Sequence, residues 1–216
     1  MSSLKRFARS SVFLTLQNGL DNPDIISHTA ERVIAGTTSH GVTLLGPGEV
    51  RHAGLGDTVI GPWKGVDRGE VIHVRDVLDE AGIRTRISED VRSELWGKVV
   101  VNAAINPLAA LASVPNGRLV QDRNLAGLLD EVGREALAVA RAAGARLDAE
   151  EILRRTRLIA RRTAANRASM LQDLDRHRRT EIEAITGAVL REAERHDIDA
   201  PLNRVLYALV RAREGI

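Results

Sequence analysis

The spacing of apolar residues changes once along the chain, at about residue 90, and this change limits the folds that its 216 residues can adopt. Before that point, short β-prone runs alternate with turns rich in glycine and proline, a pattern typical of strands and hairpins. After it, apolar residues recur every three or four positions, as they do in amphipathic helices. The sequence therefore predicts α/β structure over residues 1–90 and an all-helical domain over residues 91–216.

The expected elements follow from local signals. Strands are predicted over residues 11–16, 33–38, 41–45, 50–52 and 58–60, with a hairpin turn at residues 46–49. A helix over 66–81 is predicted to end at Gly82, since glycine commonly follows the last helical turn. In the second part, helices are predicted over residues 90–112 and 124–143, and further helices begin at Asp148, Thr180 and Pro201.

Two of these helices have a predicted capping arrangement at their first turn. Asp148 is expected to be the N-cap of one helix, with Glu151 three residues later. Thr180 and Glu183 are expected to form a capping box, in which each side chain binds the other residue's backbone N–H.

Composition excludes several classes of protein. There is no cysteine, so neither disulfides nor thiolate metal sites are possible. No apolar run approaches about 18 residues, and the basic N-terminus lacks a signal-peptide pattern, so no membrane partner and a cytoplasmic location are expected. The six histidines lack ligand spacing, so no metal site is expected, and His40 is expected to make a local hydrogen bond.

Arginines crowd residues 154–179, which raises the possibility of nucleic-acid binding. However, no aromatic residue lies among them for stacking on bases, and nearby acidic residues offset their charge. The formal net charge of the whole chain is only +2. A solvated helix face explains this pattern better, and no nucleic-acid partner is expected.

A polar stripe lies along the otherwise apolar helix expected over residues 90–112. Its members recur every four residues: Glu94, Lys98, Asn102 and Asn106. Such a stripe on a buried helix must face a cleft or internal polar partners. Alternatively, Glu94 and Lys98 form a simple ion pair and Asn106 ends the helix before Pro107. The scarcity of lysine favours function, because arginine would serve an ion pair equally well but cannot give up its proton.

A second polar set is predicted on an arginine-rich helix. Asn166, Ser169 and Asp173 have the spacing of residues that share one helix face. Glu181 follows in the first turn of another helix, where the free N–H groups favour a carboxylate. By itself, this pattern is explained better by N-terminal capping than by catalysis.

Six motifs occur in an order and spacing typical of one enzyme family. They are Gln17-Asn18-Gly19, Gly36-Thr-Thr-Ser-His40, Trp96-x-Lys98-x3-Asn102-x3-Asn106-Pro107, Pro115-Asn116-Gly117, Asn166-x2-Ser169-Met-Leu-Gln-Asp173 and Thr180-Glu181-Ile182. Across essentially the whole chain, this set resembles ketopantoate (2-dehydropantoate) reductases. The resemblance implies an NADPH-dependent reductase of a small 2-keto acid, with a Rossmann-like α/β part followed by a helical domain.

The resemblance also implies roles for individual residues. Lys98 would be the proton donor, and Glu181 would bind and orient the substrate near the nicotinamide. The substrate would be held by four further side chains, those of Asn102, Asn106, Asn116 and Ser169. Asn18 would lie where cofactor and substrate meet, and the backbone near Val42 would contact the cofactor.

One family feature is not found in this sequence. The family's Gly-x-Gly-x-x-Gly turn, which binds the cofactor pyrophosphate, has no counterpart, and residues 4–9 resemble the end of the helix that precedes the Gln-Asn-Gly strand. The resemblance therefore implies that roughly 80 residues, more than two βαβ units, are missing. It also implies an exposed sheet edge at residues 11–16 and a truncated reductase, either inactive alone or completed by a second chain.

Another class of function fits the same helices. Large apolar helix faces suit a non-catalytic oligomerisation module derived from a dehydrogenase, in which Lys98 and Glu181 would be relics, and a homodimer is possible in either case. The two interpretations differ at Lys98, because its replacement by methionine would leave such a module's function unchanged.

Overall fold

A computed structural model describes residues 7–215. By their internal contacts these residues form two compact units. The first contains residues 7–17 and 21–95, and the second contains Asn18–Leu20 and residues 96–215. A short segment after the first strand thus belongs with the helical unit, although the sequence places it among the strands.

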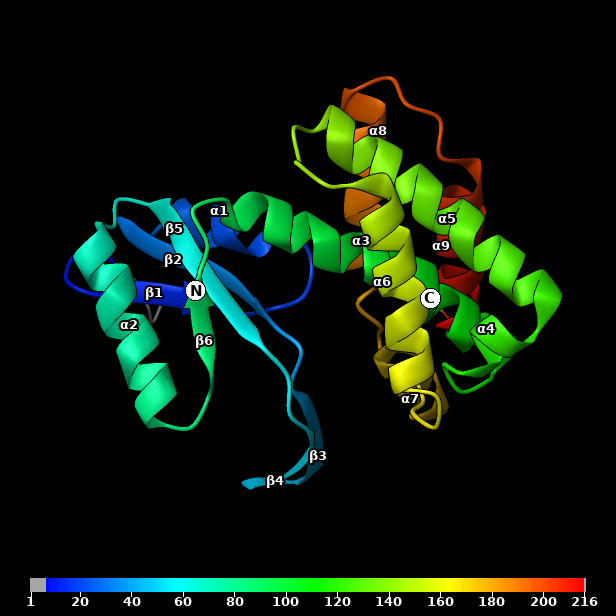
Figure 1. The fold of residues 1–216 in the computed structure, drawn as a ribbon, viewed down its shortest axis with the longest axis horizontal. Helices are drawn as coiled ribbons and strands as arrows, with labels where there is room; N and C mark the ends of the chain where they lie inside the picture. Colours follow the sequence, from blue (N-terminus) through cyan, green and yellow to red (C-terminus); the bar gives the residue numbers. More distant parts are fainter. Residues whose placement is uncertain (1–6, 216) are drawn as a thin grey trace. The chain divides into compact units, whose positions relative to one another are not determined.

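The first unit is an α/β structure, shown from blue through cyan to green in Figure 1. Its strands are β1 (Val12–Thr15), β2 (Arg32–Thr38), β3 (Gly41–Gly46), β4 (Glu49–Gly54), β5 (Thr58–Lys64) and β6 (Thr85–Ile87). Its helices are α1 (Asn22–Ser27) and α2 (Arg68–Glu80). The predicted strands and helix are confirmed, but β5 continues through Gly61 and Pro62, where it had been expected to stop.

Four strands form one sheet in the order β1-β2-β5-β6, and β3 and β4 form a separate hairpin. β1 pairs with β2 in parallel, β2 pairs with β5 in antiparallel orientation, and β5 pairs with β6 in parallel. Helix α2 packs on this sheet, where Ile34, Ile60 and Val71 are fully buried. β1 lies at the edge of the sheet, as expected from the sequence.

Local capping sets the beginning of α2. The Asp67 side chain accepts a hydrogen bond from the Glu70 backbone N–H (2.9 Å), and the Glu70 carboxylate binds the Asp67 N–H (3.0 Å). This is a complete capping box. Gly82 follows the helix with a positive φ of 79°, which confirms the predicted C-terminal glycine.

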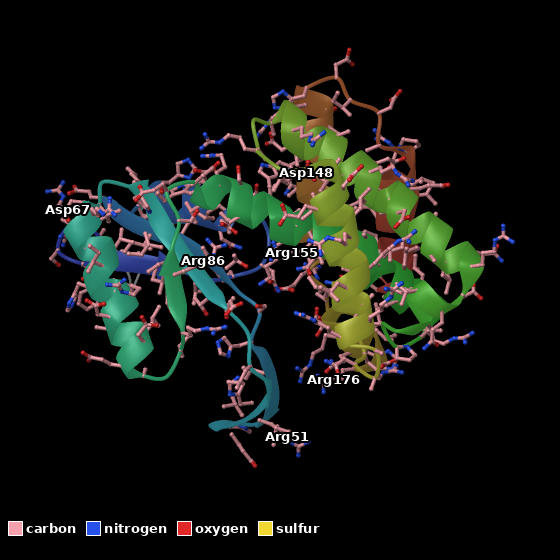
Figure 2. The ribbon with its side chains drawn as sticks, in the orientation of Figure 1. Arg51, Asp67, Arg86, Asp148, Arg155 and Arg176 are labelled. Atoms are coloured by element: carbon pink, nitrogen blue, oxygen red, sulfur yellow. The ribbon has the colours of Figure 1, made fainter. Side chains whose placement is uncertain are left out.

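The second unit is helical. Its elements are the continuation of α3 (Val91–Ala112), then α4 (Arg118–Gln121), α5 (Arg123–Ala142), α6 (Ala149–Arg162), α7 (Ser169–Asp175), the π-helix η2 (Glu183–Gly187), α8 (Ala188–Arg195) and α9 (Pro201–Arg213). Helix α6 begins at the predicted N-cap, because the Asp148 side chain accepts a hydrogen bond from the Glu151 N–H (2.8 Å). Figure 2 labels Asp67 and Asp148 at the first turns of α2 and α6.

Helix α3 is the central helix of the second unit's core. Among the described residues it alone is long and apolar enough to cross a membrane, with a mean hydropathy of 1.3, but 78% of that stretch is buried inside the protein. Its apolar residues pack against those of α5, α6 and α9 in a single cluster. The apolar sequence of α3 is therefore that of a core helix.

Candidate active site

The loop after β1 brings Asn18 to Glu181. The Asn18 Nδ2 group donates a hydrogen bond to Glu181 Oε2 over 2.7 Å, across 163 residues of sequence. Gly19 makes this approach possible. Its φ is +95°, and a Cβ atom there would lie 2.5 Å from the carbonyl oxygen of Ala184. Only glycine can hold this backbone conformation so close to the π-helix.

Gly19→Ala is expected to lower the free energy of unfolding by about 1–3 kcal/mol, because it combines a left-handed backbone with a steric clash. Thermal and urea unfolding of the purified protein measure this change. Gly127→Ala is the matched control. Gly127 lies within α5, and a Cβ atom added there would meet no other atom within 4 Å, so alanine should stabilise the helix by about 0.5–1 kcal/mol. Equal effects of the two substitutions would contradict the close approach at Gly19.

Lys98 lies on α3, one turn into the second unit, and is half-buried. Burial lowers its pKa from 10.5 to about 8, and the negative charge of Glu181 opposes this shift. The Glu181 carboxylate thus lies close enough to Lys98, within the same unit, for its charge to act on the lysine. An ammonium with a pKa near 8 is protonated at neutral pH yet acidic enough to give up its proton.

The remaining members of the α3 stripe have different surroundings. Glu94 forms an ion pair with Arg86 (2.7 Å) in the first unit. Asn102 is half-buried, and Asn106 is buried with 7% of its surface exposed. The alternative that Asn106 ends the helix is wrong, since α3 continues through Pro107 to Ala112. Proline removes one backbone hydrogen bond there, and the apolar packing around the helix outweighs that loss.

Asn116 joins two segments of the helical unit. Its backbone N–H binds the carbonyl of Asn166 (3.0 Å), and its Nδ2 donates to the Thr163 hydroxyl (2.9 Å). Its Oδ1 atom is buried and, within the described part of the chain, has no hydrogen-bond partner. A buried acceptor of this kind is costly unless a ligand or water donates to it.

The second polar set is arranged differently from the prediction. The expected arginine-rich helix is divided into α6 and α7, and Asn166 lies in the loop between them, so it does not share a helix face with Ser169 and Asp173. In this loop the Asn166 carbonyl accepts a hydrogen bond from the Asn116 N–H, in place of one from the next turn of a helix. Ser169 is exposed at the first turn of α7.

Asp173 is a member of this environment that sequence reasoning did not assign to the site. Burial raises its pKa, and the nearby Glu181 carboxylate raises it further, whereas Arg176 and Arg178 act in the opposite direction. Two carboxylates and one lysine thus share a small region of the helical unit. The motif containing Ser169 and Asp173 was a signal that could have identified it.

The residue expected near the cofactor, Val42, belongs to the first unit. It lies on β3, pairs with His52 on β4, and exposes 58% of its surface. At the same hairpin, His40 Nδ1 lies 2.9 Å from His52 Nε2, which is the local hydrogen bond expected for His40. No cluster of three or more histidine, aspartate or glutamate side chains suited to a metal ion occurs in residues 7–215.

Comparisons with known proteins agree with this architecture. Residues 90–214 match the family model "Ketopantoate reductase PanE/ApbA C terminal", and residues 2–65 match "Ketopantoate reductase PanE/ApbA". The chain is 40% identical over 206 residues to the 2-dehydropantoate 2-reductase of Archaeoglobus fulgidus, covering 95% of this chain and 69% of that protein.

Solved structures show the same fold. A PanE/ApbA family ketopantoate reductase from Ralstonia eutropha JMP134 superposes with a TM-score of 0.86 at 33% identity, covering 99% of this chain and 73% of that one. D-mandelate dehydrogenase in complex with NADH and anilino(oxo)acetate gives a TM-score of 0.93 at 25% identity, covering 99% and 71%. The fold and the matches to these relatives thus define a nicotinamide-dependent oxidoreductase. Within that class, the chain belongs to the ketopantoate reductase family.

Proposed function

We propose that this chain reduces 2-dehydropantoate to pantoate with NADPH as the hydride source. The observation that carries the proposal is the half-buried Lys98, whose pKa of about 8 is influenced by the charge of a Glu181 carboxylate that Asn18 binds. The A. fulgidus relative at 40% identity bears the name of this activity. A non-catalytic oligomerisation module would not account for a lysine buried at this energetic cost.

The substrate carries a carboxylate, a ketone and a hydroxyl group, and the site offers a complement for each. Lys98 supplies positive charge and a proton for the ketone oxygen. Asn102, Asn106 and Ser169 offer hydrogen bonds to the carboxylate. Glu181 and the unpaired Asn116 Oδ1 accept hydrogen bonds from a hydroxyl.

The reaction requires a proton as well as a hydride. When bound, NADPH supplies the hydride that adds to the ketone carbon. The Lys98 ammonium gives its proton to the ketone oxygen as that oxygen becomes an alkoxide, so the product is a hydroxyl group and Lys98 is left neutral. Glu181 keeps the ammonium oriented and is held in turn by the Asn18 amide.

The residues present fit one end of the cofactor. The Asn18 side chain offers polar groups for the nicotinamide half, and Glu181 lies beside Asn18. No Gly-x-Gly-x-x-Gly turn occurs within these 216 residues to hold the pyrophosphate. We assign that role to residues outside this sequence, on a preceding segment or a second chain. Preference for NADP over NAD, a homodimer and a cytoplasmic location belong to the proposal as well.

The test is turnover of 2-dehydropantoate, with NADPH and in parallel with NADH, by the purified protein supplied with a pyrophosphate-binding segment, either fused ahead of it or as a second chain. We expect pantoate to form and NADPH to be consumed in equal amounts, with NADPH preferred. A binding measurement accompanies it, in which pantoate shifts the side-chain NMR signal of Lys98. Absence of both turnover and any Lys98 shift would contradict the proposed substrate.

The rate of reduction is expected to depend on pH through Lys98. The ammonium form is the proton donor, so reduction should be pH-independent below the pKa of about 8 and should fall tenfold per pH unit above it. Oxidation of pantoate needs the neutral amine and should rise over the same range. A pH–rate profile measured in both directions checks this, and a reduction rate unchanged up to pH 10 would exclude Lys98 as the donor.

A further inference from the structure

The backbone that precedes Glu181 is held by a residue from the last helix. In place of the predicted capping box with Glu183, the Thr180 N–H donates to Glu214 Oε1 over 2.7 Å, across 34 residues of sequence. The Thr180 hydroxyl accepts a hydrogen bond from the Ile182 N–H (3.1 Å) and not from the Glu183 N–H that a capping box requires. The predicted box is therefore wrong in both halves, and a distant carboxylate replaces the local one.

The Glu214 carboxylate is fully buried, with 0% of its side chain exposed. Each of its oxygens has a partner: Oε1 accepts from Thr180, and Oε2 pairs with the Arg211 guanidinium over 2.9 Å. A buried carboxylate is tolerated only when its oxygens are satisfied in this way. Removing it would leave both the Thr180 N–H and the arginine without a partner.

The backbone that follows Glu181 is attached to the same helix. Glu183 accepts a hydrogen bond from the Tyr207 hydroxyl and also pairs with Arg191. The Tyr207 hydrogen bond, followed by the Arg191 contacts, lowers the pKa of Glu183. These contacts explain why Glu183 does not turn back to Thr180 as a capping box requires. Tyr207 lies within α9, and Glu214, seven residues later, is the C-cap residue of the same helix.

Glu181 therefore lies between two points at which the chain is tied to α9. Its own carbonyl accepts a helical hydrogen bond from Ile185 (3.0 Å), so the residue is continuous with the π-helix that follows. π-Helical turns often occur at functional sites, where they displace one side chain from the regular spacing. With both flanking residues fixed, the remaining freedom at Glu181 is mainly that of its side chain, which Asn18 binds.

We propose that Glu214 and Tyr207 are positioning residues: through Thr180 and Glu183 they fix the backbone on either side of Glu181 and so hold its carboxylate at Lys98. We call these two contacts, Glu214 with Thr180 and Tyr207 with Glu183, the α9 brace. Its role in catalysis rests on the function proposed above, but its effect on the position of Glu181 does not. Both act through Glu181.

The pKa of Lys98 measures this effect directly, without substrate or cofactor. The chain has only three lysines, Lys5, Lys64 and Lys98, so the Lys98 side-chain signal can be assigned in a protein with isotope-labelled lysine and titrated. Glu181 is the charge that raises the pKa of Lys98. Displacement of Glu181 should therefore lower that pKa.

Four variants carry the test. Glu181→Gln defines the full decrease in the pKa of Lys98. Glu214→Ala is expected to cause at least half of it, whereas Glu214→Gln, which keeps a hydrogen-bond acceptor for Thr180 but loses the charge, should cause little. Tyr207→Phe removes a single hydroxyl and should cause an intermediate decrease. An unchanged Lys98 pKa in folded Glu214→Ala, or in Tyr207→Phe if Glu214→Ala does not fold, would overturn the brace.

Glu135→Ala is the matched control at the other end of α9. The Glu135 carboxylate accepts hydrogen bonds from the backbone N–H groups of Leu202 (3.1 Å) and Asn203 (3.0 Å), so its loss loosens the same helix away from Glu181. We expect a lower melting temperature and an unchanged Lys98 pKa. A decrease equal to that of Glu214→Ala would mean that general loosening of α9 explains the result, and the brace would be wrong.

Turnover separates this inference from the proposed function. If the protein reduces 2-dehydropantoate, Glu214→Ala should lower kcat by about tenfold to a hundredfold, and Glu214→Gln should restore most of it. If the unsubstituted protein is active but Glu214→Ala leaves the Lys98 pKa unchanged, only the proposed brace is contradicted. If Glu214→Ala lowers the Lys98 pKa but the unsubstituted protein does not reduce 2-dehydropantoate, the brace is supported and only the proposed substrate is contradicted.

Discussion

Lys98→Met is expected to abolish reduction of 2-dehydropantoate and, at the same time, to make the protein more stable. Loss of the proton donor should lower kcat by about a hundredfold to ten-thousandfold. Stability should rise because the folded protein holds the ammonium in a place that disfavours its charge, whereas methionine has no charge to bury. A gain in stability together with a loss of activity is a signature of a residue kept for function.

The pH dependence of that stability gain follows from the two pKa values of Lys98. The folded value is about 8 and the unfolded value 10.5, so the unfolded chain binds more protons between them and the stability of the unsubstituted protein rises over that range. The penalty for the charged lysine is complete below pH 8 and disappears towards pH 10.5. The advantage of Lys98→Met should therefore be about 1–3 kcal/mol at pH 7 and vanish at high pH.

Lys64→Met is the natural control for this experiment. The Lys64 ammonium is exposed in the first unit and donates hydrogen bonds to the carbonyl groups of Ser27 and Ala30. Its replacement should lower stability slightly and leave turnover unchanged. Urea unfolding at pH 7 and pH 10 compares the two variants, and a loss of stability in Lys98→Met at pH 7 would show that the Lys98 charge is not disfavoured by burial.

Glu181→Gln is expected to have the second largest effect. The amide keeps the shape of the side chain but loses the charge that supports the Lys98 ammonium. We expect turnover to fall by about a hundredfold, and the alkaline limb of the pH–rate profile to move below pH 8 because the pKa of Lys98 falls. An exposed carboxylate on α8, Glu194, provides a control that should leave both quantities unchanged. A limb that moved to higher pH would contradict the facing arrangement of Lys98 and Glu181.

The elements whose determinants are local could be predicted from the sequence. The cap at Asp148 involves residues three positions apart, and the helix end at Gly82 reflects the positive φ that glycine adopts easily. Strand β6, of three residues, is too short to show a periodic pattern. Helix α1 is also short, although proline in its first turn was a usable signal.

The elements that depend on distant partners could not be predicted. The sequence around Thr180 and Glu183 meets the rule for a capping box. However, the Glu183 carboxylate binds Tyr207 and Arg191. The Thr180 N–H therefore donates its hydrogen bond to Glu214. No pattern near Thr180 indicates a partner 34 residues away. The pairing of Lys98 with Glu181 stays a prediction, and it came only from the resemblance of the motifs to those of a family. Spacing alone left an ion pair and a catalytic role as equal explanations for Lys98, and favoured capping for Glu181.

The division of the chain at its first loop has a practical consequence for anyone who wants to cut the protein into pieces. Asn18–Leu20 belong with the helices, although 75 residues of the other unit follow them in the sequence before Trp96. A recombinant fragment starting at Trp96 would therefore lack the amide that binds Glu181 and would uncover the surface of Ala184 on which Gly19 rests. Such a fragment should be studied with a short peptide containing Gln17-Asn18-Gly19-Leu20 added back, because it is otherwise an incomplete version of the helical half.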